Sequence, residues 1–174
     1  PNMIEINKNI RYEDNGNFLF IGRDEKRKNL KLFVQLANFY ESKFKFIAVT
    51  NKKTDNKSVI YHISPSEIDK KSIISNVGIY IAPNNKSESF GITILEAINQ
   101  GNVAICSNIK AFKTLLNDSG IFFAKDNFED LKKTINNLNE ENLNKIWSKQ
   151  YNYISQNYSM DKVLQKWIYV YKNI

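Results

Sequence analysis

The stretch IYIAPNNKSESFGITILEAINQGNVAICS, residues 79–107, contains the pattern that decides the fold. An apolar run from Val77 to Ala82 ends at a proline, as expected for a strand that is buried on both faces. Residues Ile92 to Asn99 predict a helix that stops at Gly101, and Val103 to Cys106 predict the next strand. A strand, a helix and a strand in this order favour two parallel strands joined by a right-handed crossover.

The alternation continues on both sides of this stretch. Further strands are predicted at Phe18 to Ile21, Phe44 to Val49, Ser58 to Ile63 and Gly120 to Phe123. Further helices are predicted at Leu30 to Tyr40, Pro65 to Ser75 with Ser64 as its cap, Ala111 to Leu116 and Phe128 to Leu138. Residues 140–174 are predicted to be helical, with a break at Tyr158 and a final helix capped by Ser159. The expected fold is therefore α/β, a Rossmann-like doubly wound parallel sheet with C-terminal helices.

Length and composition limit the class of protein. A chain of 174 residues with 42% hydrophobic and 13% aromatic residues has room for one domain with a core, and not for two. No apolar run reaches the roughly 20 residues that span a bilayer, and the N-terminus does not resemble a signal peptide. The single cysteine, Cys106, lies in a predicted buried strand, which favours a reducing compartment. We predict a cytoplasmic protein.

The net charge of +7 raises the question of nucleic acid or an anionic membrane surface as a partner. The lysines are spread along the whole chain, and no block of like charges occurs. A solvated basic surface is therefore the favoured interpretation, and we predict no nucleic-acid partner.

Two strand ends carry the residues expected to bind a ligand. In a doubly wound sheet, ligands bind outside the carboxyl ends of the strands. Gly22 and Arg23, with Lys28 beyond them, follow one predicted strand, and the loop with Glu88 follows another. We expect these two loops to face one crevice.

The loop after Pro83 leads into a helix N-terminus suited to an anion. Gly91 precedes the helix, so the amides of Ile92, Thr93 and Ile94 are expected to lack partners and to form a phosphate cradle. Glu96 lies about one turn further on and is expected to lean back toward the same cavity, where its carboxylate suits the vicinal hydroxyls of a ribose.

Arg23 and Lys28 are expected to stabilise the negative charge of a diphosphate leaving group. They could replace a metal ion, because no Asp-x-Asp pair and no His/Cys cluster occurs in the sequence. We therefore predict neither a bound metal nor a cofactor.

These motifs together resemble the signature of glycosyltransferase family 4, whose members have the GT-B fold. The similar features are two glutamates separated by seven residues around Phe90-Gly91, then Glu96-Ala97, a glycine and a strand. Gly22-Arg23 with Lys28-Asn29 is similar to the family's phosphate-binding loop, and Pro1-Asn2 to the end of its interdomain linker. After the strand at 103–106, the chain departs from the family's usual Gly-Gly-x-Pro-Glu turn.

The resemblance implies a retaining glycosyltransferase that transfers a sugar from a UDP-, GDP- or ADP-linked donor to a glycan or a lipid-linked acceptor. The chain would be its nucleotide-sugar-binding domain, with residues 1–14 as the end of the linker. The acceptor domain would be absent, the isolated chain inactive, and the full enzyme able to associate peripherally with the inner membrane face. The implied donor-site residues are Glu88 at the sugar as the catalytic candidate, Arg23 and Lys28 at the diphosphate, Glu96 at the ribose, and Ser89, Phe90, Gly91, Ile92 and Thr93 around them.

The alternative is a non-catalytic Rossmann-like module that binds a nucleotide or a nucleic acid. It would be favoured if the side chains of Glu88, Glu96, Arg23 and Lys28 did not converge.

Two further features stay open in the sequence. His62 is either a base contact or a strand-end residue satisfied by backbone. Trp147, Trp167 and the nearby tyrosines form either core or a face for the missing half.

Overall fold

The structure, a computed structural model, describes residues 2–13, 15–40, 43–86, 88–138 and 140–172 of the chain. Pro1, the first residue of the Pro-Asn pair that resembles the end of a linker, lies outside these ranges. Residue 14, where the predicted linker ends, lies outside them as well.

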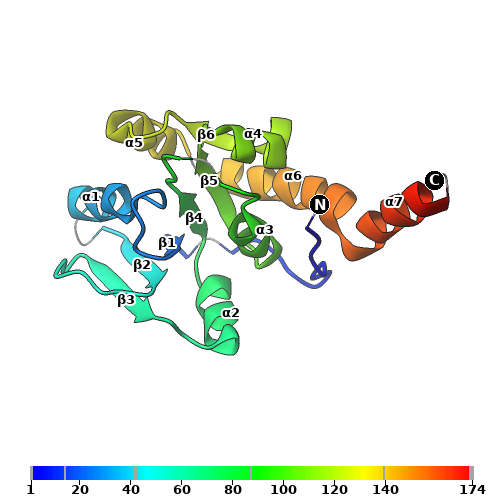
Figure 1. The fold of residues 1–174 in the computed structure, drawn as a ribbon. Coiled ribbons are helices and arrows are strands. Elements are labelled where there is room, and N and C mark those ends of the chain that lie inside the picture. Colours follow the sequence, from blue (N-terminus) through cyan, green and yellow to red (C-terminus); the bar gives the residue numbers. More distant parts are fainter. Residues whose placement is uncertain (1, 14, 41–42, 87, 139, 173–174) are drawn as a thin grey trace.

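A parallel sheet forms the centre of the molecule (Figure 1). Its strand order is β3-β2-β1-β4-β5-β6, and every neighbouring pair is parallel. The strands are β1 (Asn17–Ile21), β2 (Lys45–Thr50), β3 (Val59–Ile63), β4 (Ile79–Ala82), β5 (Val103–Ser107) and β6 (Ile121–Phe123). The chain builds one half of the sheet outward from β1 and the other half outward from β4, so the predicted doubly wound sheet is confirmed.

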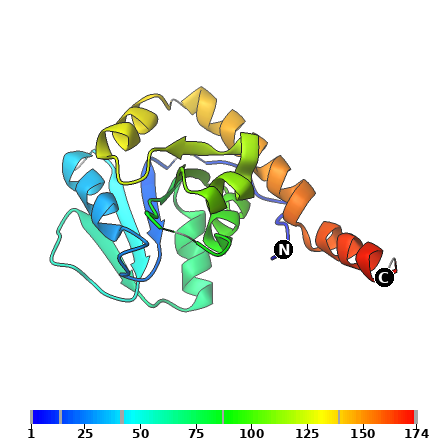
Figure 2. The same cartoon turned by 45° about the horizontal axis from the view of Figure 1, so that its top comes forward.

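Helices follow most of the strands. They are α1 (Leu30–Tyr40), α2 (Glu67–Ser75), α3 (Ile92–Asn99), α4 (Lys110–Leu116), a 3-10 turn η1 (Asn117–Ser119), α5 (Phe128–Asn136), α6 (Glu140–Tyr158) and α7 (Met160–Lys172). Strand order runs in opposite directions from β1 and from β4, so right-handed crossovers place α1 and α3 on opposite faces of the sheet. Both views show α1 beside α5, away from α3 (Figures 1 and 2).

The predicted start of α2 was wrong. Its N-cap is Ser66, whose hydroxyl accepts a hydrogen bond from the amide of Asp69 at 3.2 Å. Ser64 instead donates its amide to the carbonyl of Thr50 at 2.8 Å and has a φ of 45°. This bond continues the pairing of β3 with β2 by one residue, so the chain must still turn before a helix can begin.

The core is apolar and well filled. β4 and β5 are buried along their full length, as the continuous apolar runs predicted. Cys106 is fully buried, and burial raises the pKa of its thiol, so this cysteine is an inert core residue. In the half of the sheet that contains β1 and β2, the rings of Phe18 and Phe46 stack with centroids 4.9 Å apart.

The two C-terminal helices differ in their surroundings. Trp147 of α6 is buried and donates its indole N–H to the carbonyl of Ile98 at 2.9 Å. By contrast, Trp167 and Tyr171 of α7 are 45% and 70% exposed. Figures 1 and 2 show α7 pointing away from the sheet. The aromatic residues of this region are thus core in α6 and surface in α7.

Gln150 links α6 to strand β5 through two hydrogen bonds. Its side chain is fully buried; its amide oxygen accepts from the N–H of Ala104 at 2.9 Å, and its amide nitrogen donates to the carbonyl of Ala104 at 2.8 Å. β6 pairs with β5 only from Ile105 onward. Ala104 lies one residue before this pairing begins, so Gln150 satisfies backbone groups that β6 does not reach.

We predict that Gln150→Leu destabilises the protein by about 2–6 kcal/mol, because two buried backbone groups lose their partners at about 1–3 kcal/mol each. Gln156→Leu, at an exposed position of the same helix, is the control and should change stability by less than about 0.5 kcal/mol. Urea unfolding of both variants measures the difference. Equal stability of the two would show that the Ala104 contacts contribute little.

Candidate functional site

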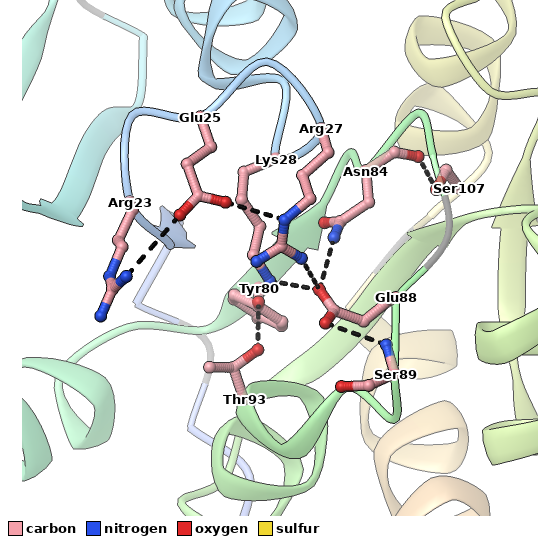
Figure 3. A network of polar contacts seen from close by, with 10 residues as sticks. All are labelled: Arg23, Glu25, Arg27, Lys28, Tyr80, Asn84, Glu88, Ser89, Thr93 and Ser107. Atoms are coloured by element: carbon pink, nitrogen blue, oxygen red, sulfur yellow. Dashed lines mark hydrogen bonds and ion pairs between the residues drawn. The ribbon is translucent and has the colours of Figure 1, made fainter.

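The site lies where the strand order changes direction. β1 and β4 are neighbours in the sheet, but the chain leaves β1 toward β2 and leaves β4 toward β5. The loops that follow these two strands therefore separate at the carboxyl edge of the sheet and leave space between them, which is where ligands bind in such folds. Residues 22–29 form one loop, and residues 83–86 and 88–91 belong to the other. Figure 3 shows the side chains that meet between them.

Backbone contacts hold the two loops together. The amide of Asn85 donates to the carbonyl of Arg27 at 3.0 Å, directly from one loop to the other. Within the first loop, the amide of Lys28 donates to the carbonyl of Glu25 at 2.8 Å, and Asn29 has a φ of 57°. Asparagine tolerates this left-handed conformation, so Asn29 can end the loop as α1 begins. Local backbone geometry thus fixes the main chain at Lys28, and its side chain extends from there to Glu88.

Glu88 is the centre of the polar network. Its Oε2 accepts from the Lys28 ammonium, from Nη1 of Arg27 at 3.1 Å and from Nδ2 of Asn84 at 2.9 Å. Its Oε1 accepts from the amide of Ser89 at 3.2 Å. The side chains of Glu88 and Lys28 are only 10% and 15% exposed. Glu88 and Lys28, both predicted site residues, are thus brought into direct contact (Figure 3).

The environment of Glu88 favours its ionised form. Burial alone raises the pKa of a carboxyl group, and Glu88 is largely buried. The hydrogen bond and charge of Lys28, the Ser89 amide and the charge of Arg27 act in the opposite direction and prevail, so the pKa of Glu88 lies below its ordinary value. Glu88 is therefore an anion near neutral pH and is unsuited to act as a general acid there.

The N-terminus of α3 lies beside this network. Gly91 caps the helix with a φ of +95°, and a Cβ at this position would lie 3.1 Å from the ring of Phe112 and 3.2 Å from Ile94. The positive φ favours glycine here, and the space beside Phe112 and Ile94 is tight for a Cβ. The amide of Ile94 donates to the carbonyl of Gly91 at 3.0 Å, so the prediction that this amide is free was wrong.

The amides of Ile92 and Thr93 have no partner among the described residues. They remain, together with the helix dipole, as donors for an anion. Beneath them, the buried hydroxyl of Tyr80 lies 3.0 Å from the Thr93 hydroxyl and is bonded to it. Burial raises the pKa of Tyr80, so its phenol stays protonated and serves to hold the first turn of α3.

Glu96 lies on a different side of α3 from Glu88. Its Oε2 lies 3.0 Å from Nζ of Lys70 on α2, which is close enough for an ion pair. The angles of this contact do not meet those of a hydrogen bond. Glu96 lines a hollow of about 780 Å³ that also includes Ile92 and Asn99. We call this the Glu96 hollow. Ile92 lies one turn before Glu96 on the same face of α3 and shares this hollow, but Glu88 and Lys28, with which Glu96 was expected to share a cavity, do not line it.

A second hollow, of about 640 Å³, borders the loop that leads into α3. We call it the Phe90 hollow. It is lined by Glu88, Ser89, Phe90, Leu115 and Tyr158, among others. The loop that leads into α3 thus lines the Phe90 hollow with Glu88 and Ser89, and the first turn of α3 lines the Glu96 hollow with Ile92.

Arg23 does not join the predicted residues. Its side chain is 78% exposed, and its guanidinium is 3.9 Å from Glu25. In Figure 3 it points away from Lys28 and Glu88. Of the four side chains expected to converge, Lys28 and Glu88 therefore meet, Glu96 lines its own hollow, and Arg23 faces solvent in this arrangement.

Sequence reasoning missed Arg27, Asn84 and Lys70. Arg27 is adjacent to Lys28, and Asn84 directly follows Pro83 at a strand end, so both positions could have been considered from the loop pattern alone. The sequence contains no signal for Lys70, which reaches Glu96 from another helix. His62 lies in β3 and lines a small hollow with Pro65 and Asp69.

The described residues contain no cluster of three or more His, Cys, Asp or Glu side chains arranged to hold a metal ion. Among the described helices, none combines the length and apolar character needed to cross a bilayer.

The sequence model of the family described as "Glycosyl transferases group 1" matches residues 3–159. A segment of 52 residues is 36% identical to the phosphatidyl-myo-inositol mannosyltransferase of Mycobacterium tuberculosis. This segment covers 30% of the present chain and 14% of that protein.

Solved structures share the fold. Sucrose-phosphate synthase from Thermosynechococcus elongatus matches 99% of this chain with a TM-score of 0.79 at 13% identity. HepE from Anabaena, solved in complex with UDP-glucose, matches 92% with a TM-score of 0.76 at 15% identity. The chain spans 51% and 49% of these two proteins, so its fold is that of one half of a GT-B enzyme.

The lowered pKa of Glu88 predicts a pH-dependent stability. A carboxyl group whose pKa is lower in the folded than in the unfolded state stabilises the fold above its unfolded pKa, and this contribution is lost as the pH falls through the folded pKa. We expect the stability difference between the natural protein and Glu88→Gln to shrink from about pH 6 to about pH 3. Urea unfolding at each pH measures it. A difference that stays constant over this range would contradict the lowered pKa.

Proposed function

Because the chain belongs to the glycosyl transferases of group 1, we propose that it is the donor-binding half of a retaining glycosyltransferase. The enzyme would transfer a sugar from a nucleotide sugar to a glycan or a lipid-linked acceptor without a metal ion. The observation that carries this proposal is the position of the first turn of α3. Ile92 of this turn lines the Glu96 hollow, and Glu88 of the Lys28–Glu88 pair belongs to the loop that leads into the turn.

The arrangement suits the three parts of a nucleotide sugar. The diphosphate would lie at the amides of Ile92 and Thr93, within reach of the Lys28 ammonium. The ribose would lie in the Glu96 hollow, where Glu96 has oxygens for two hydroxyls. The sugar would extend toward Glu88 and Ser89 at the Phe90 hollow. The separation of Glu88 from Glu96 thus fits one extended ligand. The lack of convergence of the four side chains would also fit the non-catalytic alternative, and the family match over residues 3–159 is what favours the enzyme.

The chemistry proposed for this half is stabilisation of charge. As the bond between the sugar and the diphosphate breaks, negative charge grows on the leaving phosphate. The α3 dipole, two amides and Lys28 would stabilise that charge. These groups would do the work of a divalent cation, which supports the metal-independent form of the proposal. Glu88, an anion, would orient the donor sugar through its hydroxyls.

Similar proteins support a nucleotide donor. HepE was solved with UDP-glucose, and the mycobacterial relative is a mannosyltransferase. We predict that the isolated chain transfers no sugar, because a GT-B active site is built between two halves.

We predict that Lys28→Ala weakens UDP binding about tenfold and leaves uridine binding unchanged, because the lost contact is with phosphate. Lys26→Ala removes the same charge from an exposed neighbouring position and should have little effect. Calorimetry with UDP, GDP and ADP, and with their nucleosides, measures the difference. An equal loss for UDP and uridine would remove Lys28 from the phosphate site.

Glu96→Ala is predicted to weaken UDP binding about tenfold while leaving 2′,3′-dideoxy-UDP unaffected, because two ribose hydroxyls lose their acceptor. The matched control is Glu67→Ala. Glu67 lines the same hollow and also pairs with Lys70, but its side chain is 80% exposed. Titration of both nucleotides into both variants separates the cases. A similar loss for the two nucleotides would show that Glu96 does not bind the ribose.

A further inference from the structure

We propose that Arg27 joins Lys28 in binding the diphosphate of the donor, and that Glu88 occupies both cations when no donor is bound. Donor binding would then exchange one anion for another at these two side chains and release the Glu88 carboxylate toward the sugar. This inference rests on the proposed function and adds to it a further phosphate-binding residue and an internal competitor.

The contacts at Glu88 lead to this proposal. Both cations meet the same oxygen, Oε2, which also accepts from Asn84. An oxygen with three donors has no capacity left for a sugar hydroxyl, and its partner Oε1 already accepts from the Ser89 amide. In the donor-free protein, Oε2 of Glu88 is therefore fully engaged by protein groups, whereas Oε1 keeps one acceptor site beside the Ser89 bond. Contact of Oε2 with the donor sugar requires that some of these bonds be given up.

Charge balance favours a phosphate as the group that displaces Glu88. Residues 22–29 carry four cations and the two carboxylates of Asp24 and Glu25, and Glu88 of the other loop adds a third carboxylate, so one positive charge remains. A diphosphate brings more than one negative charge and several acceptor oxygens, and it gains the α3 amides as additional donors. A carboxylate cannot reach those amides while it also holds both cations.

Arg27 is better placed than Arg23 for this role. The Arg27 side chain is 39% exposed and crosses from its own loop to Glu88, whereas Arg23 is 78% exposed and faces away (Figure 3). The guanidinium of Arg27 is oriented by Glu25, which accepts from Nε at 2.7 Å. Its backbone is held by the bond from the Asn85 amide. The exchange therefore needs side-chain rotation only and leaves both loops in place.

A purely structural ion pair predicts different behaviour. If Glu88 only fastens the two loops, its removal should loosen the site and weaken nucleotide binding. If Glu88 competes with phosphate, its removal should free both cations and strengthen binding of a ligand that has phosphates and no sugar. UDP is such a ligand, because it lacks the group that Glu88 would contact.

The first test is calorimetric titration of UDP into the natural protein, Glu88→Gln and Glu129→Gln. Glu129 lies on α5 and pairs with Lys132, so its replacement changes the net charge equally at another place. We expect Glu88→Gln to bind UDP about tenfold more tightly and Glu129→Gln to bind as the natural protein does. Binding by Glu88→Gln that is equal to or weaker than the natural affinity would overturn the proposal and leave the proposed function standing. Absence of binding of UDP, GDP and ADP to the natural protein would overturn both.

The second test places Arg27→Gln in both backgrounds. In the natural background, Arg27→Gln removes a phosphate contact but also removes the Arg27–Glu88 bond, which UDP would otherwise have to break. We therefore expect UDP affinity to fall about threefold. In the Glu88→Gln background nothing offsets the lost contact, and we expect a loss of tenfold or more. The same loss in both backgrounds would contradict the exchange.

Lys26→Gln is the matched control for Arg27→Gln and should leave UDP affinity unchanged in both backgrounds. Circular dichroism of every variant reports whether it is folded. Should Glu88→Gln fail to fold, the comparison of Arg27→Gln with Lys26→Gln in the natural background still decides the role of Arg27. Equal UDP affinity of these two variants would overturn it.

Discussion

The carboxylate of Glu88 joins the two loops that flank the switch point of the sheet, and the arrangement of the site depends on this contact. Lys28 and Arg27 come from the loop after β1, and Asn84 and Ser89 from the loop after β4. Because Glu88 is only 10% exposed, its charge would be costly without partners, and the two cations supply them. One buried anion thus places the groups that are suited to meet a phosphate.

The first turn of α3 adds backbone donors to this network. Gly91 allows the backbone to turn into the helix where a side chain would crowd Phe112, and Tyr80 holds Thr93 from below. The amides of Ile92 and Thr93 therefore point from a turn that packing has made rigid. Preorganised donors of this kind stabilise a developing charge without reorganisation, which is the main requirement of a transfer reaction whose leaving group is a diphosphate.

Much of the fold could be predicted from the sequence, and the exceptions have local causes. The buried strands β4 and β5 and the helix α3 between them follow from continuous apolar runs bounded by Pro83 and Gly101. The cap of α2 was misplaced because Ser64 and Ser66 are both good caps, and only the pairing of Ser64 with Thr50 selects the second. Similarly, the bond from Ile94 to Gly91 depends on how tightly the first turn closes, which residue type does not reveal.

The sequence by itself determined the order of the elements, the parallel sheet, and the positions of Lys28, Glu88 and Glu96 at strand and helix ends. These follow from hydrophobic period and from turn residues, which are local properties of the chain. Only the tertiary structure decided which charged side chains meet. Arg27 rather than Arg23 reaches Glu88, because the direction of a long side chain depends on neighbours that the fold brings from other loops. An ion pair is a contact between distant segments, so its partners are defined only once the sheet has placed those segments side by side.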